Sequence, residues 1–151
     1  MKKSLLLSLL AITAVAFSCK KDEPVVAADK IYQVSTTLSG ANEIPAVTTS
    51  ATGTTTGTYN QTTKILSVST TLVGITPTAG HIHTQAVPTL PDKTGNVTFN
   101  FGTTLTSPVV YTTTIPLTTA QETDLLNGIM YVNFHTVTNK GGEIRGNLTV
   151  K

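Results

Sequence analysis

The sequence contains one cysteine, Cys19, and no tryptophan among its 151 residues. A single cysteine excludes an intramolecular disulfide, so the fold must be held by its core and its hydrogen bonds. Charged residues make up only 12% of the chain and the formal net charge is +2, which excludes the basic surface of a nucleic-acid-binding protein. We therefore expect no nucleic-acid partner.

Familiar catalytic motifs are also missing. The sequence has no Gly-x-Ser-x-Gly elbow, no phosphate-cradling glycine loop and no Cys-x-x-Cys pair. An acid pair for glycoside cleavage could be assembled from Glu43 and Glu143, but the sequence does not define their separation. We expect a binding protein more than an enzyme.

The N-terminal segment has the features of an export signal. Lys2 and Lys3 precede an apolar run at 5–17 that is too short to span a hydrocarbon core of ~30 Å. The run ends in Ala16-Phe17-Ser18-Cys19, which resembles a bacterial lipobox. We expect 1–18 to be a cleaved signal peptide and Cys19 to carry the lipid; the alternative is a free cysteine beside an ordinary cleavage site.

Residues 19–30 predict a flexible tether, because charged and small residues follow one another without a strand or helix period. Their start, Lys20-Lys21-Asp22-Glu23, resembles the tag of bacterial lipoproteins sent to the outer face of the outer membrane; the alternative is a plain solvated linker. We expect a cell-envelope lipoprotein anchored in the outer membrane by its lipid and exposed at the surface. Residues 31–151 suffice for one folded domain.

The folded part is rich in threonine and in alternating apolar residues, both of which favour strands. Tyr32, Val34, Thr36 and Leu38 show the period of two that is typical of a half-buried strand. With Gly, Pro, Asn and Asp between the segments, the pattern predicts an all-β fold, a sandwich or barrel, and we expect a single antiparallel β-sandwich of seven to nine strands. The predicted strands are 32–38, 53–59, 66–72, 81–84, 97–101, 109–115, 129–135 and 143–150.

One short helix interrupts this pattern near residues 119–127. Thr119 and Glu122 have the spacing of a capping box, and Gly128 suits the left-handed residue that ends a helix. Two tight connections are predicted at 60–64 and 139–142, where Asn, Lys and Gly cluster.

Five sequence blocks in a fixed order resemble the CHRD domain, a domain named after chordin and also found in secreted bacterial proteins. The resemblance covers about residues 34–150 and implies no established catalytic role. The blocks are Leu38-Ser39-Gly40-Ala41-Asn42-Glu43-Ile44-Pro45, Gly80-His81-Ile82-His83, the helix at 117–128, Tyr131-Val132-Asn133-Phe134-His135-Thr136 and Gly141-Gly142-Glu143-Ile144-Arg145-Gly146.

A weaker resemblance links residues 72–83, with their His-x-His pair, and the glycine pair at 141–142 to copper/zinc superoxide dismutases. It implies a related Greek-key β-sandwich, like immunoglobulin or superoxide dismutase domains. The dismutase redox site uses more histidines than the three present here, so the resemblance does not extend to that activity.

The three histidines are the candidate metal ligands. His81 and His83 stand at i and i+2 of a predicted strand, so both rings can lean toward one ion. His135 lies in another predicted strand and can supply a third nitrogen, with Glu43 as the first choice for a carboxylate ligand and Glu143 as the second. Such a set predicts zinc or copper. The alternative is that the histidines are ordinary hydrogen-bonded sheet residues.

Arg145 shares a strand face with Glu143, and we expect a surface ion pair between them. Its functional alternative is an orienting partner for Glu43 or an anion contact. Taken together, these features predict a lipid-anchored envelope module of CHRD type that binds an extracellular protein or glycan and carries a metal on its histidines. The alternative is a small metal-dependent envelope enzyme with a dismutase-like or hydrolytic site.

Overall fold

The computed structural model describes residues 28–85, 94–103 and 105–151. The predicted signal peptide at 1–18, the lipidation site Cys19 and nearly all of the tether at 19–30 lie outside these residues. In the described part of the chain, no helix has the length and apolar character needed to cross a membrane.

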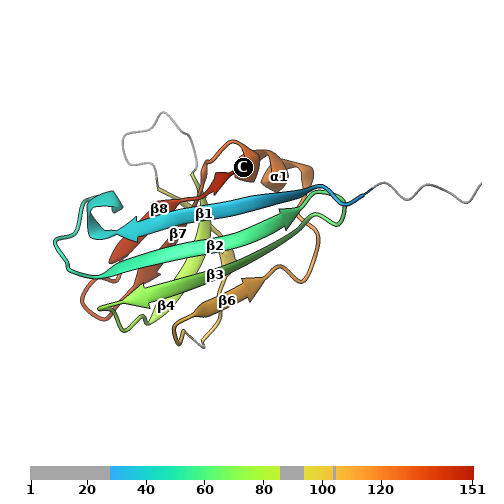
Figure 1. The fold of residues 1–151 in the computed structure, drawn as a ribbon. Helices are drawn as coiled ribbons and strands as arrows, with labels where there is room; N and C mark the ends of the chain where they lie inside the picture. Colours follow the sequence, from blue (N-terminus) through green and yellow to red (C-terminus); the bar gives the residue numbers. More distant parts are fainter. Residues whose placement is uncertain (1–27, 86–93, 104) are drawn as a thin grey trace, which may run out of the picture.

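The described residues form nine strands, a short 3-10 helix and one α-helix (Figure 1). This confirms an all-β fold with one short helix. The elements are β1 (Ile31–Ser39), η1 (Gly40–Asn42), β2 (Thr52–Asn60), β3 (Ile65–Val73), β4 (Ala79–Gln85), β5 (Gly95–Asn100), β6 (Val109–Thr112), α1 (Thr119–Leu126), β7 (Met130–His135), β8 (Ile144–Asn147) and β9 (Thr149–Val150).

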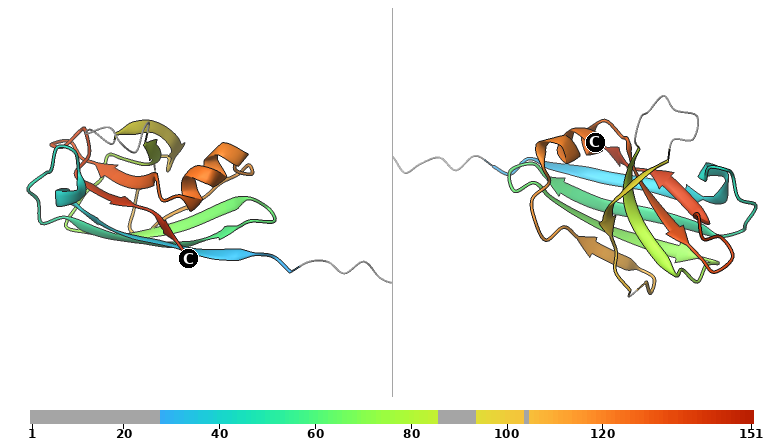
Figure 2. Two further views of the ribbon diagram at one scale, coloured as in Figure 1. Left: turned by 90° about the horizontal axis from the view of Figure 1, so that it is seen from above. Right: turned by 180° about the vertical axis from the view of Figure 1, so that it is seen from behind.

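All nine strands belong to one antiparallel sheet in the order β5-β4-β7-β8-β1-β2-β3-β6, with β9 paired to β1. The sheet curls into a half-barrel, so that one half of it faces the other as the layers of a sandwich do (Figure 2). The two halves stay joined because β8 pairs with β1 at Ser39 and Arg145. The strands that the sequence pattern assigns to a sandwich are therefore one continuous sheet.

The core lies between the two halves of the sheet. Leu66 and Val68 of β3 point into it from one half, and Ile82 and Phe134 point into it from the other, each at most 2% exposed. Threonine also enters this core, because the buried hydroxyl of Thr55 forms a hydrogen bond with the threonine hydroxyl of Thr70 on the neighbouring strand. The alternation in the sequence thus separates an inner face from an outer face in each half.

Helix α1 begins one residue earlier than the capping signal in the sequence predicted. Thr118 is the N-cap: its Oγ1 accepts a hydrogen bond from the Gln121 amide, and the Gln121 side chain reaches back to the Thr118 amide. The predicted Thr119–Glu122 box is wrong, because Thr118 has the extended backbone that a cap requires and Glu122 instead pairs with Lys64 at 3.0 Å.

Candidate metal centre

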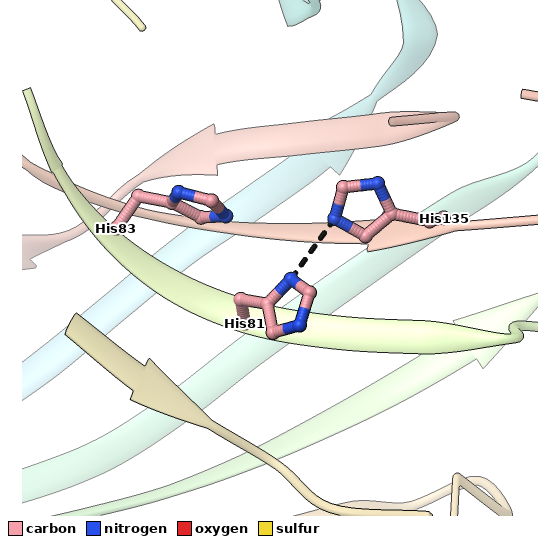
Figure 3. Close-up of side chains that lie close together, drawn as sticks. All are labelled: His81, His83 and His135. Atoms are coloured by element: carbon pink, nitrogen blue, oxygen red, sulfur yellow. Dashed lines mark hydrogen bonds between the residues drawn. The ribbon is translucent and has the colours of Figure 1, made fainter. Parts of the chain in front are cut away.

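His81 and His83 lie on β4, and His135 ends the neighbouring strand β7 (Figure 3). In the β4–β7 register, His81 is opposite Asn133 and His83 is opposite Tyr131, so all of these side chains share one face. It is the outer face, since Ile82 between the two histidines is buried in the core. The structure therefore brings together the three histidines that the sequence selected.

The spacing of the three rings matches that of a shared ion. His81 Nδ1 and His135 Nε2 are 3.0 Å apart, and one nitrogen from each histidine lies within 4.8 Å of the other two. Two imidazole nitrogens bound at 2.0–2.1 Å to one tetrahedral zinc ion stand about 3.3 Å apart. For all three nitrogens to reach the same ion, the group has to draw together and the hydrogen bond between His81 and His135 has to give way to the ion.

Backbone carbonyls hold two of the rings in a ligand-ready orientation. His83 Nδ1 donates to the Gly95 carbonyl at 2.8 Å, and His135 Nδ1 donates to the Lys140 carbonyl at 2.9 Å. A neutral imidazole that donates through Nδ1 carries its lone pair on Nε2. This second hydrogen bond is the usual partner of a metal-bound histidine, where it fixes the tautomer and the ring plane.

The electrostatics favour neutral rings. Burial lowers the pKa of all three histidines, and the positive charge of one ring opposes that of the next: His135 and His83 further lower the pKa of His81. The carbonyls of Gly95 and Lys140 act in the opposite direction on His83 and His135, more weakly than burial. Neutral imidazoles are the form that binds a metal.

The preferred carboxylate, Glu43, is buried beside the cluster but is not a member of it. Its side chain is 7% exposed and borders Gly142, Asn133 and Arg145. Burial raises the pKa of Glu43 from 4.5 to about 7, although Arg145 and hydrogen bonds from Ile44 and Asn133 act to lower it. Among the described residues, the group whose ligand atoms converge consists of the three histidines.

The second choice, Glu143, holds the neighbouring loops together. Its oxygens accept hydrogen bonds from the hydroxyls of Thr49 at 2.8 Å and Thr136 at 2.6 Å. These bonds lower the pKa of Glu143, Thr136 having the larger effect. With both oxygens in use, Glu143 ties the loop before β2 to the β7–β8 turn.

Arg145 is not a surface residue, so the predicted surface ion pair is wrong. Its side chain is 2% exposed, and its guanidinium lies 3.5 Å from the centre of the Tyr131 ring. Tyr131 in turn stacks on His83, with ring centres 4.9 Å apart and planes 4° from parallel. The β7–β8 register places Arg145 opposite Asn133, on the face that carries the histidines.

Three buried polar atoms at this face have no hydrogen-bond partner among the described residues: His83 Nε2, Asn133 Oδ1 and Glu43 Oε1. Leaving a buried polar group unsatisfied costs about 1–3 kcal/mol, so such groups are normally paired. Asn133 and Tyr131 were not selected from the sequence as site residues. Their spacing of two and four residues from His135 is the signal that places them on the same face.

Two glycines of the recognised blocks are explained by close packing. A Cβ at Gly142 would clash with the Glu43 carboxylate, and its φ of 138° is unfavourable for other residues. A Cβ at Gly80 would lie 2.7 Å from Cδ1 of the Phe134 ring. Both positions let the backbone approach side chains that build the site and the core behind it.

Comparison with known families gives one match: the model of the CHRD domain matches residues 34–148. The chain therefore belongs to the CHRD family, which confirms the resemblance seen in the five sequence blocks. No curated protein and no solved structure matches the chain. The likeness to superoxide dismutases stays a prediction.

Proposed function

We propose that this protein is a CHRD module of the bacterial cell envelope that binds a zinc or copper ion through His81, His83 and His135. The observation that carries the proposal is the convergence of one nitrogen from each histidine within 4.8 Å. Three neutral imidazoles are a common donor set for these two metals.

The hydrogen bonds to Gly95 and Lys140 add support, because rings that are already oriented lose little freedom when the ion binds. The pattern also opposes the alternative of ordinary sheet histidines: His83 Nε2 is buried without a hydrogen-bond partner among the described residues. A sheet histidine in its lowest-energy setting would have both nitrogens bonded.

Metal binding can be tested on the full chain, purified without a histidine tag and stripped with a chelator. We expect one equivalent of Zn²⁺ or Cu²⁺ to bind by calorimetry and to raise the melting temperature. At a free metal concentration 100 times the Kd, the gain in stability is about 2.7 kcal/mol.

The variant His83→Ala should lose both the binding and the thermal shift, whereas Asn96→Ala should keep them, because Asn96 is exposed on β5. Unchanged melting of the parent chain at saturating Zn²⁺ and Cu²⁺ would refute the proposal. So would equal binding by the parent and His83→Ala.

The second part of the proposal is that a lipid on Cys19 anchors the module to the outer membrane. A diacyl chain satisfies the two-signal requirement for lasting attachment. The variant Cys19→Ala should move the protein from the detergent phase to the aqueous phase on detergent partitioning. Equal partitioning of the variant and the parent would contradict lipidation at this residue.

A further inference from the structure

Asn133 occupies the centre of the outer face that carries the histidines. It lies between Tyr131 and His135 on β7, directly opposite His81 on β4 and Arg145 on β8. Its side chain is 3% exposed. A buried amide at the middle of a candidate metal site needs partners for both its oxygen and its nitrogen.

Glu43 and His83 both border the side chain of Asn133. Burial has the largest effect on the pKa of Glu43 and raises it, whereas Arg145 lowers it. A hydrogen bond from Asn133 also lowers this pKa, as an N–H donor to a carboxylate does. Beside the larger effect of burial, Asn133 raises the pKa of His83, as an oxygen acceptor beside a ring does. Glu43 and His83 are thus the two side chains beside the Asn133 amide, whose buried Oδ1 has no hydrogen-bond partner among the described residues.

Two lone pairs on this one face of the sheet have no partner among the described residues. His83 donates through Nδ1 to the Gly95 carbonyl, so its buried Nε2 is an acceptor. Asn133 Oδ1 is also an acceptor, and both atoms lack a hydrogen-bond partner among the described residues. Buried acceptors without a partner are unfavourable, and a cation bound at this face would satisfy both atoms.

We infer that Asn133 is the fourth ligand of the proposed metal ion, bound through Oδ1, and that Glu43 is the positioning residue that holds the amide in this orientation. This inference rests on the metal site proposed above. It adds an oxygen to three nitrogens, which completes the four-coordinate geometry that zinc prefers.

The geometry also gives Glu43 a different role from the direct ligand that the sequence indicated. The carboxylate lies against Gly142 and close to Arg145, with Asn133 between it and His83. The side chain of Asn133 thus separates the Glu43 carboxylate from the ion. Hydrogen-bonded carboxylates in such positions commonly orient the groups that bind the metal.

The test uses the full chain and Co²⁺, whose visible absorption reports the number and type of ligands, together with Zn²⁺ affinities from competition. Asn133→Leu should weaken Zn²⁺ binding and change the Co²⁺ spectrum, and Glu43→Gln should weaken binding by 10–100-fold, roughly the effect of removing an orienting partner. Asn133→Asp keeps an oxygen and adds a charge, so it should bind at least as tightly as the parent. Asn96→Leu is the control for an asparagine replaced elsewhere in the sheet.

The outcomes separate this inference from the proposed function. If the parent binds no metal, the metal site itself is refuted. If the parent binds and Asn133→Leu gives the same affinity and the same Co²⁺ spectrum, the histidine site stands and the role of Asn133 is refuted. Should Asn133→Leu not fold, weaker binding by Asn133→Asp than by the parent would overturn the inference equally well.

Discussion

The buried carboxyl of Glu43 predicts a pH dependence of stability that a single substitution should remove. Burial raises its pKa from 4.5, the ordinary value of a free side chain, to about 7 in the folded protein. Because the folded pKa is the higher one, folding favours the protonated form. The contribution of Glu43 to stability is therefore fully present below pH 4.5 and is lost as the pH rises through 7.

The size of the effect follows from the two pKa values. At about 1.36 kcal/mol per pKa unit, the difference between 4.5 and 7 corresponds to about 3 kcal/mol. The Glu43 side chain is only 7% exposed, so solvent screening reduces this figure little. Glu43→Gln stays neutral throughout and should become more stable relative to the parent by about 3 kcal/mol between pH 4.5 and 8.

The assay is urea denaturation of parent and variant at several pH values, with a chelator present so that no metal contributes. The three histidines have lowered pKa values and shift stability in the opposite direction, toward higher stability as the pH rises. Their effect is common to both proteins and largely cancels in the difference between them.

Glu122→Gln is the matched control. Hydrogen bonds from Lys64 and Tyr59 lower the pKa of the half-buried Glu122 carboxyl, so its contribution is lost as the pH falls below the ordinary range of a glutamate. The stability of Glu122→Gln relative to the parent should therefore stay nearly constant from pH 4.5 to 8 and change in the opposite direction only at lower pH. A difference between the parent and Glu43→Gln that stays constant from pH 4.5 to 8 would show that the Glu43 carboxyl titrates normally and would refute the reasoning.

Two further predictions concern the core and the helix. Phe134→Ala removes a fully buried ring and should cost about 3–5 kcal/mol in urea denaturation, whereas Val137→Ala, at a position that is 76% exposed, should stay within about 0.5 kcal/mol; equal losses would contradict the assigned core. Thr118→Ala should cost about 1 kcal/mol because it removes the N-cap of α1, and Thr119→Ala should cost less. If Thr119→Ala lowered the melting temperature more than Thr118→Ala, the N-cap would be Thr119, as the sequence pattern indicated.

The strands could be predicted because their signal is local. A period of two places Leu66 and Val68 of β3 on one face, and both are buried in the structure. The same reasoning predicted the helix and its left-handed end at Gly128, whose φ is 70°. The N-cap was missed by one residue, because Thr118 and Thr119 are chemically equal and only the backbone conformation distinguishes them.

The histidines show how far sequence spacing reaches into the site. The i, i+2 spacing within β4 puts His81 and His83 on one face in any strand. That His135 joins them depends on β7 pairing with β4, since their register is set by contacts far apart in the chain. The choice of strands as neighbours reflects burial of whole faces, which a local pattern does not encode.

The carboxylates and Arg145 were decided by the tertiary structure alone. By their chemistry alone, Glu43 and Glu143 are equal candidates for an oxygen ligand. In the folded chain, Glu43 lies beside Asn133, whereas Glu143 accepts hydrogen bonds from threonine hydroxyls. Arg145 stands two residues after Glu143 in the sequence, yet it is buried with its guanidinium against the Tyr131 ring. The residues themselves determined which groups could bind a metal, and the pairing of distant strands determined which of them meet, because hydrogen bonding and burial are satisfied only in the folded chain.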